Sequence, residues 1–311
     1  MLKQAVLFWL VMTNLSFAEV IYTPAEIQRV RDRAIPSIES VMWRDIVPRL
    51  PAQFQERARE VTLKYPERGP GPMSFYASPH RAEIYMPLTS LRFYDDIATL
   101  HAWFESNNCP KEYIQTYLAA LLRAGEDLPA PLVAFGLDRE VLFADAYTYD
   151  LSGKIFSSGV QFLLAHELGH ILLSHRTGIG GVQSRQQESE ADAFALDHFA
   201  RLGGNPMGIF WYYQAAWWHD PASEEGRLQN THPVSAERMR AMAQRLIDRP
   251  HDFAHGEANP DREARLISQL GMMTSAFADI IDDDTFLTWI APAMFNDFPL
   301  SRLQEACPHP R

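Results

Sequence analysis

His166-Glu167-Leu168-Gly169-His170 is an H-E-x-x-H sequence inside a largely apolar run, Val160 to Leu173, that is long enough to form a helix. Two histidines four residues apart lie on one face of a helix, so both rings can reach one ion. The glutamate between them projects beside that ion, where it can take a proton from water. Such polar groups on an apolar helix need partners, because burying each without one costs about 1–3 kcal/mol. A bound metal ion would supply that partner.

Two carboxylates, again four residues apart, follow in the next predicted helix: Glu188 and Asp192. One of them can bind the ion while the other accepts the Nδ1 proton of a ligating histidine. Glu190 falls on a different face and is expected in solvent. The alternative interpretation of this acidic run is an ordinary charged helix face.

A third histidine ligand on the same stretch is not expected. His175 follows the second motif histidine by five residues rather than six, and Leu173 stands where a three-histidine site has the glycine that turns the chain. We therefore expect His175 to point away from the site and to act as a cation at the helix C-terminus.

Three motifs in order resemble the zinc metallopeptidase family of the CaaX prenyl endopeptidase, HtpX and the Oma-type proteases: His166-Glu-Leu-Gly-His170, Glu188-Ser-Glu-Ala-Asp192, and Thr231-His-Pro233 with Arg238. The resemblance implies one zinc ion per chain and a zincin (gluzincin) fold. It also implies roles for six residues: His166, His170 and Glu188 as zinc ligands, Glu167 as general base, Asp192 as hydrogen-bond partner of a ligand, and His232 at the site edge. The glycine-rich stretch that forms a strand at the cleft edge in soluble members of that family is missing from residues 134–157.

The fold expected is α+β and predominantly helical, with a small β-sheet beside the helix that carries the motif. Strand-like patterns cover residues 81–87 and parts of 129–149. Ser157 and Ser158 are expected to cap the motif helix at its N-terminus, and residues 178–187 to form a loop. Helices are expected at 23–66, 95–104, 110–124, 159–175, 187–202, 206–218 and 235–247, with a further helical segment toward the C-terminus.

The ends of the chain suggest export and four segments. Lys3, the apolar run Ala5 to Met12 and Ser16-Phe17-Ala18 indicate a secretory signal peptide, with a buried N-terminal helix as the alternative. We expect residues 1–18 as signal peptide, 19–75 as a helical segment, 76–248 as a zinc metallopeptidase domain and 249–311 as a helical segment packed on it. The protein would then be periplasmic or secreted. No later segment has the length of a transmembrane helix, although peripheral membrane association stays open.

The chain has two cysteines, Cys109 and Cys307, which suit an oxidising compartment. A disulfide between them is slightly favoured over two buried free thiols. The formal net charge of −11 argues against nucleic acid as a partner and against a polybasic membrane patch.

These observations predict an exported zinc-dependent metalloendopeptidase in which Glu167 activates water for attack on a peptide bond. A role in envelope protein quality control or processing is implied by the resemblance alone. His232 could stabilise an oxyanion, occupy the fourth zinc position, or be an ordinary loop histidine. Two alternatives stay open: a zinc-stabilised binding or chaperone-like module plugged by His232, and a helical module in which the motif is coincidental.

Overall fold

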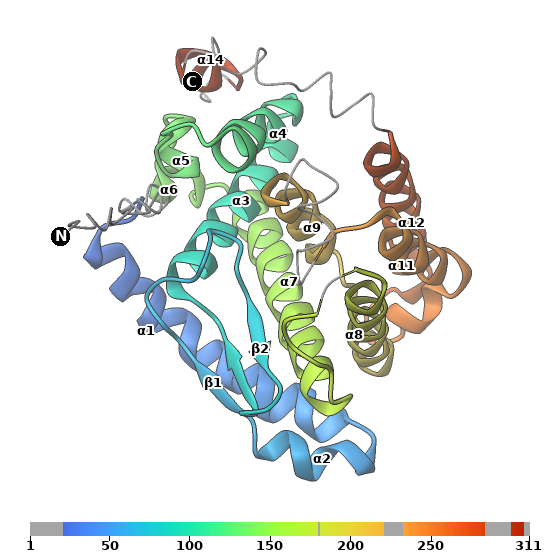
Figure 1. Ribbon diagram of the computed structural model, residues 1–311. Helices are drawn as coiled ribbons and strands as arrows, with labels where there is room; N and C mark the ends of the chain where they lie inside the picture. Colours follow the sequence, from blue (N-terminus) through green and yellow to red (C-terminus); the bar gives the residue numbers. More distant parts are fainter. Residues whose placement is uncertain (1–20, 180, 221–232, 284–299, 308–311) are drawn as a thin grey trace, which may run out of the picture.

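The structure is a computed structural model, and it describes residues 21–179, 181–220, 233–283 and 300–307 (Figure 1). The predicted mainly helical fold with a small sheet is confirmed. The elements are α1 (Pro24–Ser40), η1 (Val41–Ile46), η2 (Val47–Arg49), α2 (Ala52–Arg59), β1 (Thr62–Lys64), β2 (Tyr76–Ser78), β3 (Glu83–Tyr85), α3 (Leu88–Ser106), α4 (Glu112–Leu118), η3 (Ala119–Ala124), α5 (Pro131–Ala134), α6 (Arg139–Leu142), α7 (Ala146–Leu172), α8 (Gly181–Leu202), α9 (Gly208–His219), α11 (Ala236–Asp248), η4 (Pro250–Phe253), α12 (Pro260–Asp282) and α14 (Leu300–Glu305).

Helix α7, which carries the H-E-x-x-H motif in its last turns, runs through the middle of the molecule (Figure 1). Helices α3, α8 and α9 pack around it, and α11 and α12 lie outside α8. Asp145 begins the helix, because its carboxylate accepts the backbone N–H groups of Tyr147 and Thr148. Asp138 caps α6 in the same way.

Several expected boundaries are wrong. The expected caps at Ser157 and Ser158 lie inside α7, and the Ser158 hydroxyl donates to the carbonyl of Lys154, four residues back. Short helices replace the strand-like pieces expected within residues 129–149, and the helix expected to continue to residue 66 ends at Arg59, before β1. Most of the loop expected at 178–187 is the first part of α8.

The sheet has three short strands in the order β1-β3-β2. Strand β3 lies within the predicted strand 81–87; it pairs in parallel with β1, Leu63 opposite Ile84, and antiparallel with β2, Ala77 opposite Ile84. Strand β2 is therefore an edge strand, and it packs against α7. The sheet thus lies beside the motif helix, as expected.

Helices α7 and α9 cross at backbone contact distance through two glycines. A Cβ on Gly208 would overlap the carbonyl oxygen of Ile155, and a Cβ on Gly159 would overlap the hydroxyl of Tyr94. That hydroxyl, fully buried, donates 2.7 Å to the carbonyl of Gly208. The crossing therefore requires residues without a side chain at both positions.

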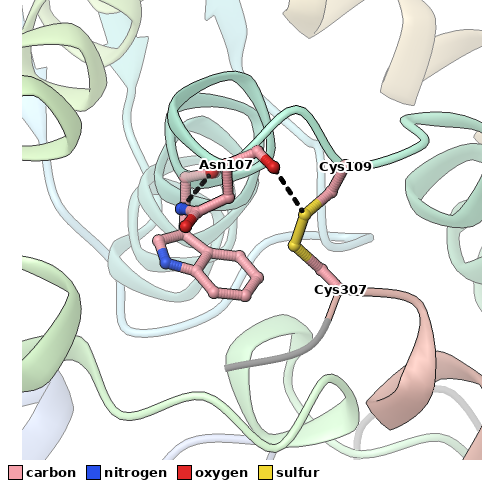
Figure 2. The surroundings of a disulfide bond; sticks show 4 residues. Asn107, Cys109 and Cys307 are labelled. Atoms are coloured by element: carbon pink, nitrogen blue, oxygen red, sulfur yellow. Dashed lines mark hydrogen bonds between the residues drawn. A yellow bond between two sulfur atoms is a disulfide. The ribbon is translucent and has the colours of Figure 1, made fainter. Parts of the chain in front are cut away.

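Cys109 and Cys307 form a disulfide, which confirms the expected pairing (Figure 2). The bond joins the segment after α3 to the end of α14, across 198 positions of sequence. Within the described ranges, the helices are too short or too polar to cross a bilayer. Residues 1–18, expected as a signal peptide, lie outside the described residues.

Alanine at Gly159 should destabilise the fold by about 1–3 kcal/mol, because the added methyl group overpacks the crossing. Gly153 of the same helix is exposed, and a Cβ there meets nothing within 4 Å. Gly153→Ala should therefore stabilise the protein by about 0.5–1 kcal/mol through helix propensity. Urea unfolding followed by circular dichroism measures both, and equal effects of the two substitutions would contradict the close crossing.

Asp145→Ala should lower the free energy of unfolding by about 1 kcal/mol through loss of the cap, and Asp145→Asn should recover only part of it, because both carboxylate oxygens accept hydrogen bonds and an amide has one acceptor oxygen. Hydrogen bonds from Thr148 and Ser106 lower the pKa of Asp145 to about 2. The folded pKa lies below the unfolded value of roughly 3.9. The stability that Asp145 adds is therefore fully present above about pH 4 and is lost as the pH falls toward 2. Urea unfolding at pH 6 and pH 2.5 should show the difference between wild type and Asp145→Ala shrinking at the lower pH; a constant difference would exclude the ionised cap.

Candidate metal centre

Three potential ligands from two helices meet in the core. His166 and His170 project from α7 and Glu188 from α8, and all three are buried. Their ligand atoms lie close together: 3.1 Å between the two histidine Nε2 atoms, 3.4 Å from Glu188 Oε2 to His166 Nε2, and 3.3 Å from Glu188 Oε1 to His170 Nε2. A tetrahedral zinc ion with bonds of about 2.0–2.1 Å holds its ligand atoms roughly 3.3 Å apart. The three side chains are therefore close enough to hold one metal ion of this kind.

Asp192 fixes the ring of His166 from behind. Its Oδ1 lies 2.9 Å from the Nδ1 of His166, so the opposite nitrogen faces Glu188 and His170. Burial opposes charge on both groups. The nearby carboxylates of Asp192 and Glu188 nevertheless raise the pKa of His166 to about 10. Likewise Arg238, together with His166, lowers the pKa of Asp192 to about 2.

Arg238 of α11 closes the network and is itself buried. Its guanidinium donates to both oxygens of Asp192 at 2.8 and 2.9 Å and lies 3.1 Å from Glu188 Oε2. The hydroxyl of Tyr213 donates to Asp192 at 2.5 Å and accepts from Arg238 at 2.8 Å. The sequence motifs include Arg238 but gave it no role, and they do not include Tyr213; both side chains reach the site from helices other than α7 and α8.

The charges of this cluster call for a cation. Glu167, Glu188 and Asp192 are each at most 2 % exposed, and among these buried groups Arg238 supplies one positive charge. In the state that can bind a metal, both histidines are neutral and the formal sum is −2; a protonated His166, which its raised pKa favours in the absence of a metal, reduces the sum to −1. Buried charges are stable when they are paired or bind a metal, so a divalent ion would balance the cluster.

The structure contradicts the expected orientation of His175. Its Nδ1 lies 2.9 Å from the Nδ1 of His170, and its Nε2 lies 3.1 Å from Oε2 of Glu190. The reason is a sharp reversal at the end of α7, where Ser174 adopts the left-handed conformation (φ 61°) and the N–H of His175 returns to the carbonyl of His170. Glu190, expected in solvent, keeps a 47 % exposed side chain but contacts His175.

A cleft of about 420 Å³ opens over these residues. Glu167, His170 and Glu188 line it, and Oε2 of Glu167 has no hydrogen-bond partner among the described residues. One wall comes from edge strand β2 and the residues before it, including Met73, Phe75 and Ala77; other lining groups are Arg176, Gln187, Tyr212, His219 and Asp220. The strand beside the cleft is therefore β2, which precedes residues 134–157 in the chain.

His232 lies outside the described residues. Its sequence neighbour Pro233 is described, and the Pro233 carbonyl accepts a 2.6 Å hydrogen bond from Arg238. The next residue, Val234, donates its N–H to Asp220 at 2.7 Å. The described chain thus resumes in contact with the network that holds Glu188.

Comparison with known proteins gives one family. The sequence model of the family described as Peptidase U49 matches residues 111–257, just under half of the chain, and this range includes both helices of the candidate metal centre. The similarity points to a peptidase. No curated protein and no solved structure matches the chain.

This match corrects the resemblance drawn from the motifs. The family of the CaaX prenyl endopeptidase, HtpX and the Oma-type proteases does not match, and Peptidase U49 is a different peptidase family. The physical reason is that the shared residues are few and locally determined. Two histidines of one helix reach the same ion readily when they are four residues apart, so this spacing can occur in families that are otherwise different.

Replacing Arg238 with alanine should cost about 3–5 kcal/mol of stability, because the change leaves the buried carboxylates of Asp192 and Glu188 without their cation. Arg240 of the same helix provides the control: it is exposed and pairs with Asp279 and Asp282 on the surface. Arg240→Ala should cost less than about 1 kcal/mol. Chemical unfolding of both variants measures the difference, and similar losses would show that the buried network does not stabilise the fold.

Proposed function

We propose that the protein is a zinc-dependent metalloendopeptidase with a zincin-type site. The observation that carries the proposal is the convergence of two histidine nitrogens and a carboxylate at 3.1–3.4 Å, next to a glutamate oxygen with no described partner, in a cleft. The similarity to a peptidase family supports the peptidase part of this proposal. His166, His170 and Glu188 would hold one zinc ion, and Asp192 would orient His166.

Zinc in a three-ligand site acts as a Lewis acid and makes water a nucleophile near neutral pH. Glu167 would accept the proton of the attacking water at Oε2 and then deliver it to the leaving amine. Glu167 is a buried residue of α7 that lines the cleft, and its Oε2 has no hydrogen-bond partner among the described residues. For His232, which lies outside the described residues, the proposed role is that of an oxyanion donor or a fourth ligand.

Strand β2 gives the cleft a means of binding a peptide. One edge of β2 pairs with β3, and residues 75–77 also line the cleft. An extended peptide can add to a free strand edge through backbone hydrogen bonds, which depend little on side-chain identity. This supports protein or peptide segments in extended conformation as the substrate.

The segment layout and the location belong to the same proposal. Residues 76–248 would form the metallopeptidase domain, with residues 19–75 and 249–311 packed on it. The Cys109–Cys307 disulfide suits the oxidising periplasm or exterior, to which the signal-like residues 1–18 would direct the chain.

Glu167→Gln tests the proposal. The variant should keep about one zinc per chain, since the amide that replaces this carboxylate would not disturb the three ligands. It should cleave a reduced, unfolded protein about 10²–10⁴-fold more slowly than wild type, the usual contribution of a general base. Zinc analysis and a gel-based cleavage assay are the measurements. His170→Ala is the control that should lose zinc and activity together. Undiminished cleavage by Glu167→Gln would rule out the mechanism.

A further inference from the structure

His175 and Glu190 form a second chain of contacts behind the candidate metal centre, next to His170 rather than His166. From the site outward it runs His170 Nδ1 to His175 Nδ1 at 2.9 Å, then His175 Nε2 to Glu190 Oε2 at 3.1 Å. Gln186 donates to the other oxygen of Glu190 at 2.9 Å. This inference rests on the proposed metal site, because it concerns what orients one of its ligands.

With a metal ion bound at the site, the contacts allow one consistent placement of protons. The Nε2 of His170 faces Glu188 and His166, so it must present its lone pair to a cation, and the proton of the neutral ring then sits on Nδ1. That N–H donates to Nδ1 of His175. The proton of His175 is then on Nε2, where the carboxylate of Glu190 accepts it. The opposite arrangement would put a proton on His170 Nε2 and block the metal.

Backbone contacts hold His175 in this position. Its N–H donates to the carbonyl of His170 at 2.9 Å, directly after the left-handed Ser174. The next residue, Arg176, exchanges two hydrogen bonds with the side chain of Gln187 on α8, at 2.9 and 3.0 Å. The segment after α7 is thus joined to the helix that supplies Glu188 and Glu190.

We propose that His175 and Glu190 are positioning residues that fix the tautomer and ring orientation of His170. The two histidine ligands are then oriented differently. His166 directly contacts the buried carboxylate of Asp192, which pairs with Arg238. His170 contacts the imidazole of His175, which in turn contacts the carboxylate of Glu190, a side chain that is 47 % exposed. Loss of such a partner of a ligating histidine typically weakens metal affinity 10–100-fold.

The test compares His175→Ala and Glu190→Ala with Asp197→Asn. Asp197 is an exposed carboxylate of the same helix α8 that pairs with Arg245, away from the site. Zinc affinity is measured by competition with a chromophoric chelator, and ligand geometry by the visible absorption spectrum of the Co²⁺-loaded proteins. We expect His175→Ala to bind zinc 10–100-fold more weakly with a shifted Co²⁺ spectrum, Glu190→Ala to follow with a smaller loss, and Asp197→Asn to match wild type.

Unchanged zinc affinity and an unchanged Co²⁺ spectrum in both His175→Ala and Glu190→Ala would overturn the inference while leaving the zinc site itself intact. If His175→Ala does not fold, Glu190→Ala decides alone, because its side chain is half exposed and its loss leaves the core packed. Absence of zinc binding by wild type would instead refute the proposed function. Nitrogen NMR of His170 in the zinc-free proteins adds a readout that fold stability does not move: the Nδ1–H form should dominate in wild type and give way to mixed forms in His175→Ala, because in the zinc-loaded proteins the metal itself fixes the tautomer.

Discussion

Helices α7 and α8 bury three carboxylates and two histidines in one cluster, to which α11 adds an arginine. The charges of this cluster must be balanced for the fold to be stable. Desolvating each ion costs several kcal/mol unless it is paired with good geometry. Arg238 neutralises only one negative charge of the three formally present. A divalent cation between His166, His170 and Glu188 would supply the remainder. The same charges that make the cluster unfavourable without a metal make it a strong binding site with one.

The surrounding elements fix the positions of α7 and α8 relative to each other. The close crossing of α7 and α9 sets the position of the motif helix, and α11 contributes Arg238 from outside α8. The small sheet adds little to the core, yet it places edge strand β2 along the cleft. The two ends of the segment 221–232 are anchored at Asp220 and Pro233, one on the cleft and the other on Arg238. The hydrogen bonds of Arg238 to Pro233 and Asp192 therefore connect the candidate metal centre with the surrounding helices.

The sequence was most informative where local geometry determines the outcome. The four-residue spacings of His166 with His170 and of Glu188 with Asp192 follow from helix periodicity, and the structure brings all four side chains together. The position of His175 could not be predicted, because it depends on a left-handed residue at Ser174, a type that rarely adopts this conformation. The N-terminal extension of α7 was missed because serines can back-bond within a helix as well as cap it. The resemblance to the family of the CaaX prenyl endopeptidase was wrong for a related reason: a four-residue spacing between two ligands on one helix is set by local geometry and does not identify a family.

X-ray absorption at the zinc edge of the purified protein tests the central claim most directly. The account predicts about one zinc per chain, coordinated by nitrogen and oxygen at about 2.0–2.1 Å with the signature of two imidazole rings. It also predicts that Glu188→Ala removes one oxygen ligand or the ion itself. A protein purified without zinc, or a zinc ion bound through sulfur, would contradict it.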